Sequence, residues 1–413
     1  MSNLDKNESK NSDDKMSLEL RALEFINQGK LSNAEKIYRD LIDKGTQNHV
    51  TYGNLAIICG VKGNRDDMIK FLRKSIEIEP RYEQAYNNLG IALREQNDLD
   101  GAIIFFEKAI ELKPDYSDAY LNLGIVMYQK NNIERAKIFY KKALDIDPIN
   151  IKSLNGLAIT YEHENEFDKA ISCYKKALEI NPSSSEIYKN LANSFLKKGQ
   201  IDQAIISYKK SIEINSLDSS SHNNLASALK KKGNFDEAIC EYNNAIKNDP
   251  KNAKAYFNLG VLLAEMGNST AAVNAYKKSI NVDPNYVESY TNLGLIFQEE
   301  GYIESAIDSY YKALEIQPNN PKSRWNLAIA QLLTGNYIDG WRNYDWRLNN
   351  LNSNKLHSSP KSKPIFENIF ELNEDLLVIS EQGLGDTIQY MRYIPYLRDH
   401  GLNIYFSAQE KLH

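Results

Sequence analysis

Asparagine recurs every 34 residues through most of the chain. Because a carboxamide has two N–H donors and an acceptor oxygen, a row of them can pair with successive peptide groups of an extended polypeptide without reading its side chains. The spacing therefore predicts a sequence-tolerant peptide-binding row, although the same residues could instead support packing between helices. The row consists of Asn54, Asn88, Asn122, Asn190, Asn224, Asn258, Asn292 and Asn326, with Gly156 as its interruption.

A second candidate site lies near the C-terminus, where the apolar run 376–380 is typical of a buried parallel strand. The string EQGLGDTIQ follows at residues 381–389, then a helical pattern and a second strand through 403–406. In such a β-loop-α-β unit, anions can bind at the helix N-terminus. Gly383 and Gly385 are the candidate acceptor or phosphate loop, and Asp386 could be a cap of the helix.

The elements that hold the asparagines follow from a 34-residue repeat. From the second frame on, position 7 is leucine and position 8 is glycine or alanine, which gives a first helix a large anchor beside a gap. On a second helix, position 20 is alanine, with Met68 as an exception, and position 24 carries a large ring such as Tyr140. The frames open at Lys15, His49, Glu83, Ser117, Ile151, Ser185, Ser219, Ala253, Val287 and Pro321.

The turns repeat as well, because position 15 is glycine or asparagine in every frame, as in Gly63 and Asn131. These residues tolerate the left-handed conformation that ends a helix. Proline at position 32, as in Pro114, ends the second helix of most frames. Ser216 stands in that place once, and we expect a looser junction there.

Composition narrows the function classes. A chain of 413 residues is too long for one ordinary core, and its net charge of −5 comes from mixed acids and bases. We therefore expect no nucleic-acid binding. Cys59, Cys173 and Cys240 lie far apart, so we expect no metal site, and a reduced cytoplasm fits them best. Residues 1–14 lack the apolar core of a signal peptide, and no stretch is long and apolar enough to span a membrane.

These repeat residues resemble those of the tetratricopeptide repeat (TPR) family over residues 15–350. The resemblance implies an all-α TPR α-solenoid superhelix whose first helices line a concave groove. We expect a disordered N-terminus at 1–14 and nine repeats at 15–320. The row of asparagines resembles the ladder of the O-linked N-acetylglucosamine transferase superhelix, whose matching positions hold acceptor polypeptides.

The regular repeat ends in the tenth frame, where Gly340 replaces the expected alanine. All three tryptophans, Trp325, Trp341 and Trp346, fall in this frame, which indicates a domain junction. We expect a degenerate repeat at 321–349, a linker rich in Asn, Ser, Lys and Pro at 350–372, and the truncated start of a Rossmann-like domain at 373–413.

The junction segment and the string at 381–389 together resemble bacterial TPR-linked glycosyltransferases, whose catalytic part is heptosyltransferase-like. The resemblance implies that Asp386 acts as general base on the attacking hydroxyl, beside Gly385. It also implies a nucleotide-sugar donor, which a second domain would bind. The sequence stops at His413, before such a domain, so we expect a shortened gene product or a fragment, with no cofactor in this chain.

The sequence thus supports two main hypotheses. The first is an interaction scaffold that binds a client or acceptor polypeptide in its groove, derived from the acceptor-recognition arm of a glycosyltransferase. The second is part of an enzyme that transfers a sugar to a hydroxyl. A third, assembly through the convex face, has no distinctive patch in its favour, and the oligomeric state stays open.

Overall fold

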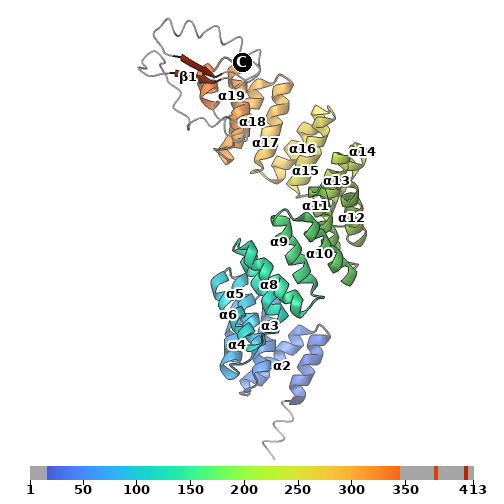
Figure 1. Ribbon diagram of the computed structural model, residues 1–413, viewed down its shortest axis with the longest axis vertical. Helices are drawn as coiled ribbons and strands as arrows, with labels where there is room; N and C mark the ends of the chain where they lie inside the picture. Colours follow the sequence, from blue (N-terminus) through green and yellow to red (C-terminus); the bar gives the residue numbers. More distant parts are fainter. Residues whose placement is uncertain (1–15, 345–375, 380–403, 408–413) are drawn as a thin grey trace, which may run out of the picture. The chain divides into compact units, whose positions relative to one another are not determined.

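The computed structural model describes residues 16–344, 376–379 and 404–407. The chain divides into two compact units, Met1–Tyr344 and Asp345–His413. The first unit is a series of helix pairs that pack in chain order (Figure 1). It confirms the predicted all-α TPR solenoid.

Each repeat contributes a first helix and a second helix. The first helix of the first repeat covers residues 16–27. The first helices that follow are α3 (His49–Val61), α5 (Glu83–Glu95), α7 (Ser117–Gln129), α9 (Ile151–His163), α11 (Ser185–Lys197), α13 (Ser219–Lys232), α15 (Ala253–Glu265), α17 (Val287–Glu299) and α19 (Pro321–Leu333).

The second helices start after the predicted turns. They are α2 (Leu31–Asp43), α4 (Arg65–Ile78), α6 (Leu99–Leu112), α8 (Ile133–Ile146), α10 (Phe167–Ile180), α12 (Ile201–Ile214), α14 (Phe235–Asn248), α16 (Ser269–Val282), α18 (Ile303–Ile316) and α20 (Tyr337–Tyr344). The tenth repeat therefore keeps both of its helices, and α20 is described up to Tyr344.

The core is distributed along the stack, as the repeat pattern predicts. The alanines at position 20 are fully buried, and the rings at position 24, such as Tyr140 and Tyr174, are at most 3% exposed. A β-carbon on Gly124 would lie 2.6 Å from the ring of Tyr140, so the small residue at position 8 makes room for the ring. Met68 is accommodated in place of alanine because Gly60 faces it: a β-carbon there would lie 2.7 Å from the Met68 sulfur.

The predicted turns are confirmed at every frame. Position 15 has a positive φ in all ten frames, including three asparagines, Asn97, Asn131 and Asn165, with φ of 64°, 57° and 61°. Many of the described helices also begin at a residue whose side chain accepts a hydrogen bond from a backbone N–H of the first turn, which stabilises the helix start. These caps are Asn48, Asn64, Asp98, Asn132, Asn150, Ser184, Asp218, Asn252, Asn268 and Asn320.

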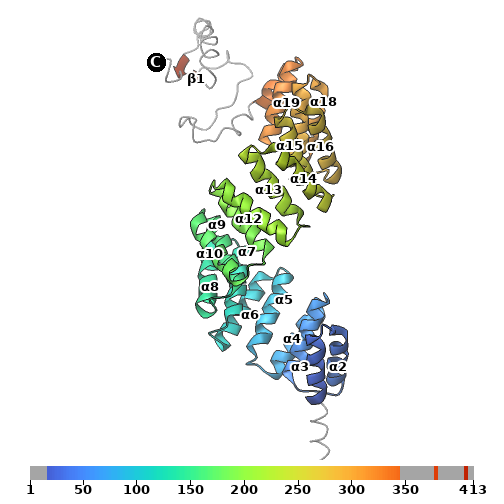
Figure 2. The same ribbon diagram turned by 90° about the vertical axis from the view of Figure 1, so that its right-hand side faces the viewer.

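The first helices lie closer together than the second helices. First helices of adjacent repeats contact one another, as α5 does α7 and α13 does α15, in addition to their contacts with second helices. Among the described residues, second helices of adjacent repeats contact one another at most marginally. The first helices therefore form the inner row of the stack. Figure 2 shows the stacked helix pairs turned by 90° from Figure 1.

The second unit has two described strands. β1 (Leu376–Ile379) and β2 (Ile404–Ser407) pair in parallel, with Leu376 opposite Ile404 and Ile379 opposite Ser407. A parallel pair needs a crossover connection, as the sequence predicts. The predicted loop residues Gly383, Gly385 and Asp386 and the helix after them lie outside the described residues.

Candidate peptide-binding face

Hydrogen bonds between first helices identify the side chains of the inner row. Lys197 of α11 bonds Glu162 of α9, and Lys230 of α13 bonds Glu265 of α15, at 2.9 and 2.6 Å. Lys322 of α19 reaches the oxygen of Asn292 in α17 at 3.1 Å. These residues stand at repeat positions 2, 6, 12 and 13. We call the surface formed by positions 2, 5, 6, 9, 12 and 13 of the first helices the inner face.

The structure places all eight predicted asparagines on the inner face. Seven are half-buried, whereas Asn122 is only 7% exposed. Each first helix carries its asparagine at the same register because the repeat length never changes. The row is thus continuous along the stack apart from Gly156.

Three of the eight donate to a second asparagine in the preceding repeat. The amide nitrogen of Asn122 lies 2.9 Å from the oxygen of Asn87, and the corresponding distances for Asn190 to Asn155 and Asn258 to Asn223 are 3.1 and 3.0 Å. The acceptors occupy position 5 of alternate repeats. Sequence analysis missed them, although asparagine at position 5 recurs with twice the repeat length.

The other asparagines have different partners. Asn54 and Asn292 donate to the hydroxyls of Tyr38 and Tyr276, at 3.1 and 3.4 Å. Asn88 makes no side-chain hydrogen bond with any described residue, and the amide nitrogen of Asn326 is buried without a partner in the described part of the chain. The row therefore combines carboxamides that pack with others that keep free hydrogen-bonding capacity.

The residues at position 9 of the first helices, which we call the floor of the inner face, are mostly apolar. The floor is polar only at Asn193 and Ser227, in two adjacent repeats. The Asn193 oxygen accepts from the Tyr208 hydroxyl and from the Asn224 amide, and the Ser227 hydroxyl lies 3.1 Å from that of Tyr242. These bonds orient the Asn193 amide group so that its N–H donors are left for other partners.

A largely buried carboxylate lies beside this polar floor. The Glu162 side chain is 14% exposed and accepts from Tyr174, Ser194 and Lys197. Burial, together with the nearby Glu162 charge, raises the pKa of Tyr174 well above its usual range. The Tyr174 hydroxyl therefore keeps its proton and donates a hydrogen bond to Glu162, and the cluster links α9 and α10 to α11 by hydrogen bonds.

The tyrosines at position 4 of the first helices could either pack against the adjacent repeat or form an aromatic cage. Tyr52 and Tyr86 donate to the carbonyls of Thr46 and Pro80 in the preceding loop, at 3.4 and 3.2 Å. Tyr120 lies below the ammonium of Lys142, which is 5.5 Å from its ring centroid. These contacts favour the packing interpretation.

At the junction without proline, the tyrosine is replaced by His222. Its ring lies 3.1 Å from the Ser216 carbonyl and 2.6 Å from the Glu241 carboxylate. Asn248 donates to the same carbonyl at 2.8 Å. Two side chains therefore hold the loop where a looser junction is expected.

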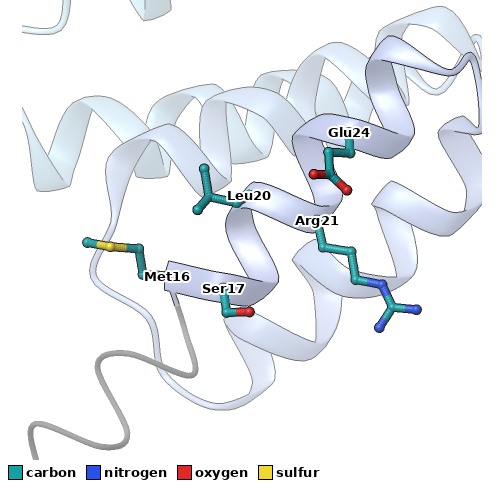
Figure 3. Close-up of a pocket in the computed structure, with 5 residues that line it drawn as sticks. All are labelled: Met16, Ser17, Leu20, Arg21 and Glu24. Carbon is teal, nitrogen blue, oxygen red and sulfur yellow. The ribbon is translucent and has the colours of Figure 1, made fainter.

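A surface pocket of about 540 Å³ lies at the N-terminal end of the array (Figure 3). Its lining side chains, Met16, Ser17, Leu20, Arg21 and Glu24, all project from one helix. Arg21 stands at position 7, where later repeats bury leucine, so the first described helix carries a polar side chain at this position.

Two of the three cysteines are at least partly buried, whereas Cys240 is exposed. All three are free, and burial raises the pKa of the Cys59 and Cys173 thiols, which disfavours the reactive thiolate. Within residues 16–344 and the two strands, no group of three His, Cys, Asp or Glu residues could hold a metal ion. No helix among them is long and apolar enough to cross a membrane.

Family models match the repeats and define the class of protein. Models described as TPR repeat match residues 90–131, 226–267 and 263–301. Models described as tetratricopeptide repeat match residues 71–104, 117–150, 151–184, 173–206, 207–239 and 287–320. Together they extend over residues 71–320, so the chain belongs to the tetratricopeptide repeat family and is a protein-interaction scaffold.

Comparison with solved structures gave matches that include the following three, which all have TM-scores below 0.5. YrrB, described as a TPR protein with an unusual peptide-binding site, is 26% identical over 45% of this chain and 95% of its own, with a TM-score of 0.38. The Cut9–Hcn1 heterotetramer of the APC/C is 21% identical over 76% of this chain and 62% of its own, with a TM-score of 0.49. PilF of Pseudomonas aeruginosa is 22% identical, covers 53% of this chain and 97% of its own, and has a TM-score of 0.46. A search of curated protein sequences gave no match.

Proposed function

We propose that the inner face binds an extended polypeptide and that the asparagines at position 6 hydrogen-bond its backbone. The observation that carries this proposal is the row itself, which repeats one carboxamide at one register along the stack. Asn54, Asn190 and Asn258 donate inside the protein, and their oxygens accept no hydrogen bond from the described residues. Those oxygens are left to accept from peptide N–H groups.

The expected affinity is modest. Each net hydrogen bond contributes about 0.5–1.5 kcal/mol, and association costs at least about 4 kcal/mol. A full row of bonds therefore supports a Kd of roughly micromolar at best. This suits transient capture of a client or of an acceptor polypeptide.

A peptide titration tests the proposal. The probe is a fluorescein-labelled, unstructured 20-residue Gly-Ser-Gln peptide, titrated with the full chain and followed by fluorescence anisotropy. The triple variant Asn54→Ala, Asn190→Ala, Asn258→Ala removes the three free carboxamide oxygens and is expected to bind at least about tenfold more weakly, because three hydrogen bonds to the peptide are lost.

The matched control removes three exposed asparagines from the second helices α14 and α16, as Asn243→Ala, Asn274→Ala and Asn281→Ala. It is expected to bind like the unchanged chain. If the inner-face variant and the unchanged chain bind the peptide with equal affinity, the asparagines do not contact the peptide and serve only in packing. Circular dichroism of both variants checks that the helices are retained.

The parallel pairing of β1 with β2 favours a second candidate function. A strand order of this kind begins a doubly wound sheet, and we propose as the alternative that the chain is part of a TPR-linked glycosyltransferase with Asp386 as general base. Gly383 and Gly385 would then form the acceptor loop, and a nucleotide sugar would be the donor. Transfer of a labelled sugar by the chain, lost in Asp386→Asn, would support this function. No transfer after addition of a donor-binding domain would remove it.

A further inference from the structure

Charge is distributed unevenly along the inner face. We compared the side chains at positions 2, 5, 9, 12 and 13 of successive first helices. In α3, α5 and α7 they include one base, Arg94, and two acids, Glu95 and Asp118. In α17 they include two acids, Glu288 and Glu299, and no base. The helices on either side, α3 to α7 and α17, are therefore neutral to acidic, and α19 carries one base, Lys322, which reaches Asn292.

The central first helices, α9 to α15, differ. Their inner-face positions carry three acids, Glu162, Glu186 and Glu265. The lysines at the same positions are twice as numerous and come from all four helices. They are Lys152, Lys189, Lys197, Lys230, Lys231 and Lys254.

Only half of these lysines form ion pairs with acidic side chains of the chain itself. Lys189 pairs with Asp218, Lys197 with Glu162 and Lys230 with Glu265, at 3.0, 2.9 and 2.6 Å. Lys152, Lys231 and Lys254 are exposed and form no ion pair with any described residue.

Lysines at the same repeat positions, whose partners are known, show that these three side chains lie on the inner face. Lys231 shares position 13 with Lys197, which bonds Glu162 across the inner face. Lys152 and Lys254 share position 2 with Lys322, which reaches Asn292. The three unpaired ammonium groups therefore stand at inner-face positions of α9, α13 and α15.

The polar floor lies in the same repeats. Asn193 and Ser227 interrupt the apolar residues of position 9 in α11 and α13, between these lysines. Since the Asn193 oxygen is occupied by Tyr208 and Asn224, its amide offers N–H donors. Lysine ammonium groups beside amide donors form a surface suited to carboxylates.

We propose that the part of the inner face formed by α9, α11, α13 and α15 binds an acidic segment of the client polypeptide. This inference rests on the proposed peptide-binding function and adds the chemistry of the bound segment. The carboxylates are side chains of Glu or Asp, and they pair with Lys152, Lys231, Lys254 and the Asn193 amide. The neutral ends of the face bind the flanking residues through their backbone.

Two matched peptides test the proposal with the full chain. Both are 20-residue, unstructured and blocked at the two termini, so that only side chains carry charge; one contains eight Glu and the other eight Gln in a Gly-Ser background. The Glu peptide is expected to bind at least fivefold more tightly at 50 mM salt, and less of that advantage is expected at 200 mM because salt screens exposed charges.

The variants locate the effect. A triple variant is expected to lose the preference for the Glu peptide and to keep the affinity for the Gln peptide. It carries Lys152→Gln, Lys231→Gln and Lys254→Gln. The control Lys175→Gln, Lys277→Gln, Lys312→Gln removes three exposed, unpaired lysines from the second helices α10, α16 and α18, and is expected to keep the preference.

The outcomes separate the two proposals. Equal binding of both peptides would overturn the acidic specificity and leave the peptide-binding function standing. Binding of neither peptide would overturn both. Loss of the preference in the control variant, or tighter binding of single-stranded DNA than of the Glu peptide, would overturn the inference by showing a general attraction of anions.

Discussion

The asparagines at position 6 have different surroundings, although the sequence makes them look equivalent. Asn122 is buried and bonded to Asn87, whereas Asn88 is half-buried and bonds no described side chain. The members of the row therefore differ in how much hydrogen-bonding capacity they retain for the proposed peptide contact. Asn88→Ala should affect binding more than folding, and Asn122→Ala the reverse.

Asp218 links a helix start to the inner face. Its carboxylate caps α13 by accepting from the Ser220 backbone N–H and also bonds Lys189. Burial acts to raise its pKa, but hydrogen bonds from Ser221, Ser220 and Lys189 outweigh burial and lower it to about 2. Since this value lies below the unfolded value of about 3.9, the ionised side chain stabilises the fold above about pH 4.

We expect Asp218→Ala to lower the free energy of unfolding by about 1 kcal/mol at pH 7 through loss of the cap. Asp218→Asn keeps a good capping residue and should isolate the charge. The stability difference between the unchanged chain and Asp218→Asn should shrink as pH falls from about 4 to about 2, where the carboxylate becomes protonated. Urea unfolding across this pH range measures it. A difference that grows towards low pH would contradict the assignment.

At the scale of helices, the turns were the most predictable feature. Glycine or asparagine at position 15 and proline at position 32 predict where each helix ends, and all ten turns have the expected positive φ. Local backbone chemistry decides these conformations, so they follow from the sequence alone. The asparagine pairs between repeats do not, because they depend on which side chains adjacent helices bring together.

The strain of the left-handed conformation can be measured in α7. Asn131 ends this helix at a φ of 57°. We expect Asn131→Ala to destabilise the fold by about 1 kcal/mol, because alanine lacks the short polar side chain that lets asparagine tolerate the left-handed conformation. Asn131→Gly should be neutral or stabilising. Thermal unfolding of both variants checks the order, and equal losses would mean that the asparagine side chain itself matters.

At the scale of the whole molecule, stability in a repeat stack is a sum of local terms. Gly124→Ala would bring a β-carbon to 2.6 Å from the ring of Tyr140, which is 3% exposed and closely packed. We expect a loss of about 1 kcal/mol or more, since overpacking outweighs the gain in helix propensity. Hydrogen exchange should increase in α5 to α9 and stay unchanged in α15 to α18. Equal increases throughout would show global cooperativity.

The two ends of the repeat array differ in a way that the sequence only partly predicts. Arg21 and Glu24 make the first end polar, whereas Leu333, Ile338 and Trp341 are exposed at the last, with Ile338 76% exposed. The tryptophans in the tenth frame predict a junction there. The predicted catalytic residue Asp386 lies outside the described residues, so its role stays a prediction.

Hydrogen exchange with bound peptide tests the central claim most directly. The full chain is compared with and without a saturating concentration of the Glu peptide, and protection is mapped helix by helix. Peptide binding to the inner face predicts slower exchange in the first helices, greatest in α9 to α15, with little change in the second helices. Protection confined to the second helices or to the N-terminal pocket would contradict it.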